Sequence, residues 1–169
     1  MPTTTSGVDY SGSASGTLLI SEILTKVNNA KDKPKKVEVL KTYDSQPLRQ
    51  VLKGAFDPSI IWDLPDGTPP YKENDAPAGT EHTLLSNEAK RLWHFVRGAD
   101  ERLSKTKKET MFIQILEGLH ADEAKLLVSV VNKELNKSYK GLNCKSSASS
   151  QLSIILEIAF SGINFLSSE

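Results

Sequence analysis

Cysteine is almost absent from this chain of 169 residues, and its scarcity excludes two kinds of stabilisation. The single thiol, Cys144, cannot form an internal disulfide, and one cysteine cannot supply a cysteine-rich structural zinc site. The three histidines, His82, His94 and His120, lack the HxxxH and HExxH spacings of metal sites. We therefore expect no bound metal. The low cysteine content fits a reducing compartment, the cytoplasm.

Long apolar runs and targeting signals are missing as well. No apolar run reaches the roughly 18 residues of a membrane span. The N-terminal residues lack the basic-then-apolar pattern of a signal peptide. Glycine-rich phosphate loops and dinucleotide fingerprints are also absent. We expect a protein that neither binds a cofactor nor associates with membranes.

Groups for catalysis are equally scarce. His94 lies in an apolar run, Leu92-Trp93-His94-Phe95, and is interpreted as a packing or surface residue. His82 is expected near a helix cap. Cys144 precedes Lys145, whose charge favours a thiolate, but no histidine neighbours it in the sequence. The chain is therefore interpreted as non-enzymatic.

The residues that are abundant predict one soluble helical domain. Apolar residues make up 38% of the chain and charged residues 25%, which is typical of globular proteins. Residues 1–16 are small and polar, and predict a disordered arm because they offer too little apolar surface to offset the cost of ordering. Residues 17–169 are expected to form a single domain, which is usual for this length.

Apolar residues at helical spacing predict an all-α fold, a compact bundle of about six to seven helices. The predicted helices cover residues 18–28, 34–43, 46–56, 83–96, 108–119 and 122–135. The isoleucine-rich stretch 152–166 is expected to close the chain as an apolar helix or a strand-like segment. Pro34 and Pro47 suit first helical turns, and Gly98 is expected to end the clearest amphipathic helix, 83–96.

Two irregular segments interrupt the predicted helices. Asp57-Pro58 ends the helix over 46–56, because proline disfavours the helical conformation for the residue before it. A proline-rich loop is predicted over 64–80, from Pro65, Pro69, Pro70 and Pro77 with Gly67 and Gly79. Long loops inside compact domains are often functional. A second loop, basic and rich in serine, is predicted over 136–151.

Charge is balanced overall but unevenly distributed along the chain. The 21 basic residues match 21 acidic ones. Residues 26–53 nevertheless carry a net charge of +5 and residues 125–145 a net charge of +4, while residues 54–82 carry −5. If the two basic segments meet in the fold, they form one face able to bind phosphates. The alternative is that these charges lie on solvated helix faces.

From Leu19 to about Leu142 the chain resembles a family of uncharacterised small proteins encoded by large tailed phages, notably those of cyanobacteria. The resemblance lies in SEILTKV, LRQVLKGAFDPSIIW, PPYKENDAPAGTEHTLL and FIQILEGLHADEAKLL. It implies a phage-encoded protein located in the host cytoplasm, or one associated with the virion. It implies no particular activity.

The order of elements is also similar to the N-terminal helical DNA-binding domain of phage-type ATP-dependent DNA ligases. The similar positions are Leu19 with Glu22 and Ile23, Lys35 and Lys36, Leu48 with Arg49, Phe56-Asp57-Pro58, Thr83-Leu84, and the segments around Gly141. The chain departs from ligases in having no Lys-x-Asp-Gly motif, which excludes ligase chemistry, and the loop over 64–79 has no counterpart there. The resemblance implies a helical module that grips duplex DNA by its backbone.

On this interpretation the DNA-binding residues are basic residues from both positive segments, where lysine neutralises phosphates and releases counterions. They are Lys35, Lys36, Arg49, Lys53, Lys137, Lys140 and Lys145, with Lys105, Lys107 and Lys108 as a weaker third group.

The alternative is a protein-interaction or virion-assembly role. The strip Pro69-Pro70-Tyr71 in the acidic loop would then bind a phage or host protein. The apolar stretch 152–166 would provide a second contact, unless it is the last core helix.

Overall fold

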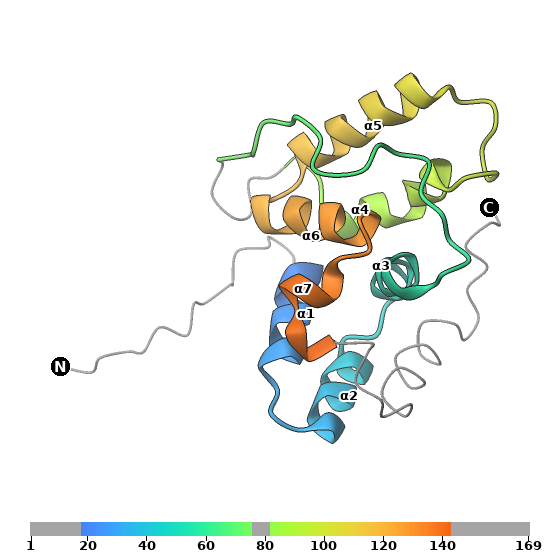
Figure 1. Ribbon diagram of the computed structural model, residues 1–169. Coiled ribbons are helices and arrows are strands. Elements are labelled where there is room, and N and C mark those ends of the chain that lie inside the picture. Colours follow the sequence, from blue (N-terminus) through green and yellow to red (C-terminus); the bar gives the residue numbers. More distant parts are fainter. Residues whose placement is uncertain (1–17, 76–81, 143–169) are drawn as a thin grey trace.

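A computed structural model describes residues 18–75 and 82–142, and this part of the chain is all-α, as predicted (Figure 1). Its α-helices are α1 (Ile20–Asn29), α2 (Lys33–Thr42), α3 (Gln46–Phe56), α4 (Leu85–Glu88), α5 (Lys105–Gly118), α6 (Ala121–Val131) and α7 (Leu135–Ser138). Two 3-10 helices accompany them, η1 (Ala89–Phe95) and η2 (Lys140–Leu142). The predicted arm over 1–16 and the closing stretch 152–166 lie outside the described residues.

The first three helices begin and end within two residues of the predicted bounds because their signals are local. Ser45 caps α3 by accepting a hydrogen bond from the backbone N–H of Leu48 at 3.4 Å. Pro34 and Pro47 lie in the first turns of α2 and α3, where a missing N–H costs nothing. In α1, Glu22 reaches back to accept a hydrogen bond from the N–H of Leu19 at 2.8 Å.

Helix α6 lies at the centre of the bundle. It packs against α1, α3, α5 and α7, with α5 at one end of the molecule and α2 at the other (Figure 1). Most of α6 is consequently buried, and its buried apolar residues are Ala124, Leu126, Leu127, Val128 and Val130. A helix that is apolar over most of its surface belongs in an interior, which explains why the other helices surround it.

The prediction of one α-helix over 83–96 is wrong. The α-helical part, α4, ends at Glu88, and the chain continues as the 3-10 helix η1. A 3-10 helix has three residues per turn, which places Ala89, Leu92 and Phe95 on one side, and all three are buried. Gly98, with φ of +81°, lies in the turn that follows.

An antiparallel bridge between Trp62 and Val96 ends η1. The N–H of Asp63 donates to the carbonyl of Phe95 at 2.7 Å, and the N–H of Arg97 donates to the carbonyl of Ile61 at 2.8 Å. Val96 is extended as a result. This pairing joins the start of the proline-rich loop to a segment more than 30 residues away, so the local helical pattern does not decide where the helix ends.

The remaining bounds also differ from the prediction. Helix α5 begins at Lys105 rather than 108, because Ser104 caps it by accepting from the N–H of Lys107 at 3.3 Å. Helix α6 ends at Val131, and Lys133 then takes a positive φ of +57°, which reverses the chain. Within the predicted loop over 136–151, the structure places the end of α7 and all of η2; residues 143–151 lie outside the described part.

The described portion of the proline-rich loop is irregular, as predicted, and lies against α5 and α6. The N–H of Gly67 donates to the Asn132 side chain at 3.1 Å, and the N–H of Lys72 donates to Glu117 at 3.2 Å. Glu73 pairs with Lys125 at 3.5 Å. The loop is therefore fixed to the helices at several points. Within the described residues, no helix has the length and apolarity needed to cross a membrane.

Candidate functional site

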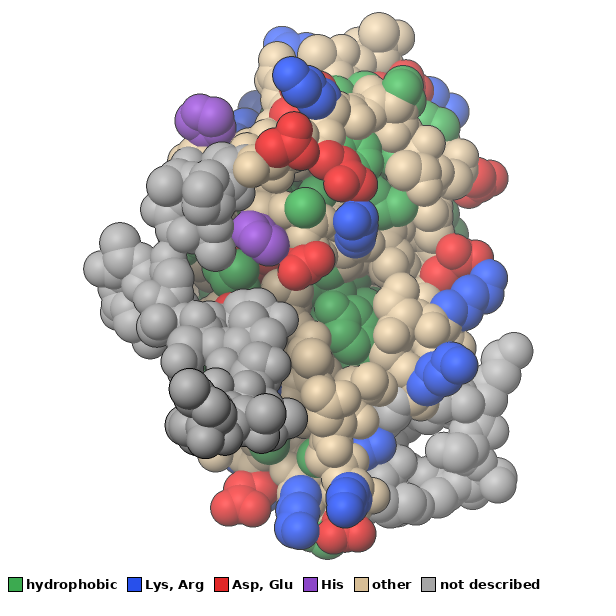
Figure 2. Space-filling view, turned by 90° about the vertical axis from the view of Figure 1, so that its left-hand side faces the viewer, with side chains coloured by type: hydrophobic (Ala, Val, Ile, Leu, Met, Phe, Trp, Pro, Cys, Tyr) green, Lys and Arg blue, Asp and Glu red, His purple; other side chains and the backbone are tan. Residues whose placement is uncertain are grey.

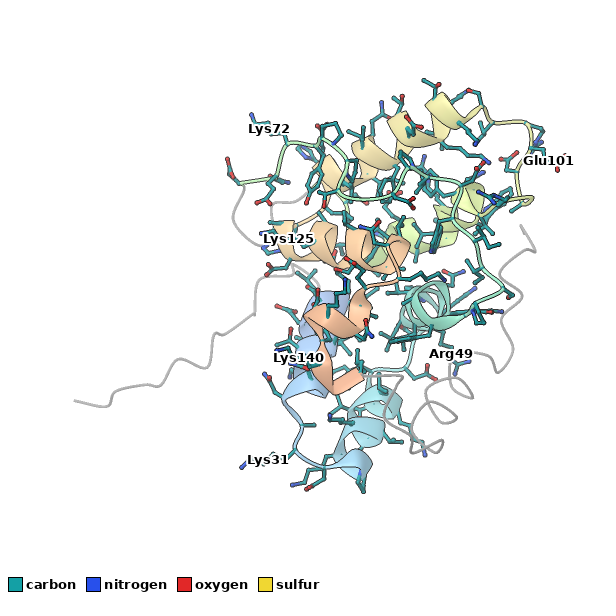
Figure 3. The ribbon with its side chains drawn as sticks, in the orientation of Figure 1. Lys31, Arg49, Lys72, Glu101, Lys125 and Lys140 are labelled. Atoms are coloured by element: carbon teal, nitrogen blue, oxygen red, sulfur yellow. The ribbon has the colours of Figure 1, made fainter. Side chains whose placement is uncertain are left out.

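Lysines from both predicted basic segments lie at the end of the molecule formed by α1 and α2. Helix α1 packs against α2 and also against η2, which brings the second basic segment beside the first. We call the surface formed by α1, α2, α7 and η2 the basic end; the lysines on these elements and on the α1–α2 connection include Lys26, Lys31, Lys35, Lys36, Lys137 and Lys140. In Figure 3, Lys31 and Lys140 lie along the same side of the molecule.

Acidic side chains accompany the cations at the basic end (Figure 2). Lys35 pairs with Asp32 at 3.4 Å, with both side chains more than 60% exposed. Lys137 pairs with Glu134 one turn away. Exposed pairs of this kind hold their cations weakly, so a phosphate can displace the carboxylate. Lys31 and Lys140 are exposed.

Arg49 and Lys53 are not part of the basic end. Both lie on α3, four residues apart, and Figure 3 shows Arg49 on the other side of the molecule from Lys31 and Lys140. Arg49 forms a two-point ion pair with Asp44, including a 2.6 Å hydrogen bond from Nε. This hydrogen bond lowers the pKa of Asp44. Lys145 lies outside the described residues.

The third group of lysines lies on α5, and the structure assigns Lys108 an internal role. Its side chain is 3% exposed, and its Nζ donates to the Asp63 carboxylate at 2.9 Å. That hydrogen bond lowers the pKa of Asp63, with a smaller contribution from Lys105 at 4.0 Å. Lys108 is thus unavailable to phosphates, whereas Lys105 and Lys107 are exposed.

The strip Pro69-Pro70-Tyr71 is only partly accessible. Pro70 is exposed, but Tyr71 is half-buried and packs against the core. Burial raises the pKa of the Tyr71 hydroxyl. The strip thus presents Pro70 from a loop whose conformation is already fixed.

A groove of about 740 Å³ that the sequence does not predict lies on the described surface. Three segments form it: the end of α3 with the turn after it, the chain from Ile60 to Gly67, and the α6–α7 connection. Apolar side chains line much of it, namely Phe56, Pro58, Ile61 and Leu64. Ile61 is 50% exposed. No local signal reveals such a groove, because it exists only where distant segments meet.

Lys133 holds one wall of the groove together. Its Nζ donates to the carbonyl of Gly54 at 2.6 Å and to that of Asp57 at 2.9 Å, which caps the C-terminal end of α3. Desolvation of this ammonium lowers the pKa of Lys133. The Trp62 indole N–H donates to the same Gly54 carbonyl at 3.2 Å.

Another polar cluster that the sequence did not predict surrounds Asp100, which is 4% exposed. The Nδ1 of His94 lies 2.7 Å from its carboxylate, and Arg102 contacts the other oxygen through its backbone N–H and its Nε. The His94 contact lowers the pKa of Asp100. His94 also stacks on Trp93. The cluster fixes the turn between η1 and α5. Among the described residues, His, Cys, Asp and Glu form no group able to hold a metal ion.

These features define a small all-α domain with lysines gathered at the basic end and an apolar groove beside α3. The chain belongs to a family of unknown function, DUF6433, whose match covers residues 23–137. The prediction of an uncharacterised family is thereby confirmed. Searches of curated proteins and of solved structures found no match.

Proposed function

We propose that the protein is a non-catalytic, phage-encoded module that binds the backbone of DNA in the host cytoplasm, without strong sequence preference. The observation that carries the proposal is the contact between α1 and η2, two elements more than 100 residues apart in the sequence, which brings the two basic segments together. Lysines on such a surface bind phosphates by neutralising charge and releasing counterions. The ligase-like order of the first helices supports the same proposal.

The basic end suits backbone contacts better than base recognition. Its cations are lysines, which bind phosphates as point charges, whereas base edges are read most often by two-point contacts from arginine. Arg49, the arginine expected to bind DNA, is paired with Asp44 away from this surface. We therefore expect binding that depends strongly on salt and weakly on base sequence.

A fluorescence-anisotropy titration across a salt series tests this proposal, with nicked duplex, intact duplex and single-stranded DNA as probes. The variant Lys31→Glu/Lys140→Glu should weaken duplex binding at least tenfold at low salt and reduce the salt slope by about 2, or about 1 per lost phosphate contact. The matched control, Lys72→Glu/Lys90→Glu, makes the same charge change at exposed lysines away from the basic end and should leave affinity within about twofold of wild type. Absence of binding at low salt would overturn the proposal.

A protein partner for the proline-rich loop is the second candidate. The favouring observation is the anchoring of the loop through Gly67 and Lys72, which presents Pro70 in a fixed conformation and reduces the ordering cost of binding. If the role is virion assembly, purified phage particles should contain the wild-type protein and lack a Pro69→Ser/Pro70→Ser variant that folds normally. Equal incorporation of both would exclude this strip as the contact.

A further inference from the structure

The groove beside α3 selects an apolar occupant because most of its polar groups already have partners. Lys133 donates to two backbone carbonyls, and the Asp57 carboxylate accepts from the N–H and hydroxyl of Ser59 at 2.8 and 2.6 Å. Asn132 accepts from the N–H of Gly67. Few hydrogen-bonding groups therefore remain for a polar ligand to satisfy.

The apolar side chains of the groove are accessible to an occupant. Ile61 is the one large hydrophobic side chain that is exposed among the described residues, and Phe56 and Leu64 beside it are half-buried. Covering such side chains stabilises a protein by about 25 cal/mol per Å² of apolar surface removed from water. An occupant with apolar side chains at regular spacing would bury the most apolar surface here and so bind with the most favourable free energy.

The chain itself contains a segment of this kind beyond Leu142. The stretch 152–166 has ten apolar residues and a single charge, Glu157. Its apolar residues include a helical series at spacings of three and four: Leu152, Leu156, Ala159, Ile163 and Leu166. An apolar surface as large as these ten side chains provide is seldom left exposed to water.

The connection is long enough for this segment to reach the groove. Asn136, on α7, lines the groove, and the described chain ends six residues later at Leu142. Those six residues span at most about 20 Å, whereas the ten residues from Leu142 to Leu152 span up to about 33 Å when extended, so the segment can return to the groove. A short tether also raises the local concentration of the segment to the millimolar range.

We propose that residues 152–166 form an amphipathic helix that packs its apolar side into this groove, against Phe56, Ile61 and Leu64 of the same chain. The docked helix completes the core at the junction of α3 with the α6–α7 connection. This inference does not depend on DNA binding, because the groove and the basic end use different residues.

Hydrogen–deuterium exchange on the full-length chain, read by mass spectrometry, tests the docking. Amides of 152–166 should exchange at least about tenfold more slowly in wild type than in Ile61→Asp, as for a segment released from a packed state. Ile61 is half exposed, so its replacement should leave exchange in α5 and α6 unchanged. The control Thr68→Asp places the same charge on an exposed loop residue that does not line the groove, and should keep the segment protected.

The reciprocal variant Phe160→Asp leaves every described residue intact and should also abolish protection of 152–166. It should shift Trp62 emission to longer wavelength, in a Trp93→Phe background that leaves Trp62 as the only indole. Rapid exchange of 152–166 in wild type would overturn the proposal, and so would protection that survives Ile61→Asp. A dimer in light scattering that dissociates in Ile61→Asp would assign the groove to the segment of a second copy instead.

Discussion

The carboxylate of Glu123 accepts a hydrogen bond from the backbone N–H of Ile20, the first residue of α1, at 3.1 Å. Its other oxygen accepts from the N–H of Leu85, the first residue of α4, at 2.9 Å. One side chain of the central helix, 1% exposed, thus binds the N-terminal ends of two other helices. A negative charge is favoured at both, because backbone N–H groups and the helix dipole converge there.

Replacement of Glu123 by alanine should lower the free energy of unfolding by about 2 to 4 kcal/mol, because it leaves two buried N–H groups without an acceptor. Urea unfolding followed by circular dichroism measures the change. The control Glu109→Ala removes a carboxylate from the neighbouring α5 and should alter stability by less than about 0.5 kcal/mol. Equal midpoints for Glu123→Ala and wild type would contradict the role assigned to this carboxylate.

The buried ion pair between Lys108 and Asp63 should be the main stabilising contact between α5 and the start of the loop. Lys108→Met keeps the length of the side chain but leaves the carboxylate only its weak 4.0 Å contact with exposed Lys105, and should cost about 3 kcal/mol. Lys107→Met, one residue earlier and exposed, is the matched control and should cost almost nothing. A double variant, Lys108→Met/Asp63→Asn, should recover part of the loss, since no charge is then left without a partner. Full additivity of the two single changes would show that the residues do not interact.

Acid should destabilise the protein through Asp63 and Asp100, whose pKa values are lowered by Lys108 and His94 respectively. A carboxyl with a lowered folded pKa contributes its full stability above the unfolded pKa, about 4, and loses it as pH falls through the folded value. Stability should therefore decline as pH falls from about 4. Urea unfolding at pH 7, 5, 4 and 3 measures this. Asp63→Asn should be less stable at pH 7 and show a shallower decline, whereas Asp66→Asn, an exposed control, should follow wild type.

Gly54 permits the close approach of α3 to Trp62. A Cβ at this position would lie 2.7 Å from the indole ring. Gly54→Ala should gain about 1 kcal/mol of helix propensity but lose about 1 to 3 kcal/mol to overpacking, with a net destabilisation. The double variant Gly54→Ala/Trp62→Phe provides room and should be less destabilised than the sum of its two single changes. A Gly54→Ala protein that is more stable than wild type would mean that the ring moves at little cost.

Local signals in the sequence were sufficient for the helices before the loop. Ser45, Pro47 and Asp57-Pro58 mark the beginning and end of α3, and the structure confirms these bounds. The sequence left open whether the two basic segments meet or lie on separate solvated faces; in the structure η2 contacts α1, although Arg49 lies elsewhere.

Long-range contacts explain what the sequence did not predict. The 3-10 helix η1 ends where Val96 pairs with Trp62, and α6 ends before a lysine with positive φ whose ammonium caps a helix nearly 80 residues earlier. The groove, likewise, exists only once α3, the loop and the α6–α7 connection are assembled. The spacing of apolar residues within one segment does not predict which distant segments that segment will contact.

The two ends of the proline-rich loop are fixed separately, and this makes the loop a natural position for engineered insertions. Asp63 is held by the bridge to η1, and the N–H of Thr83 donates to the carbonyl of Gly118 at 3.1 Å. The helices on both sides therefore keep their places whatever length of chain joins these two points. Each doubling of a flexible loop costs only about 0.6 kcal/mol, so a fluorescent or affinity tag inserted between residues 75 and 82 should leave the helical scaffold intact.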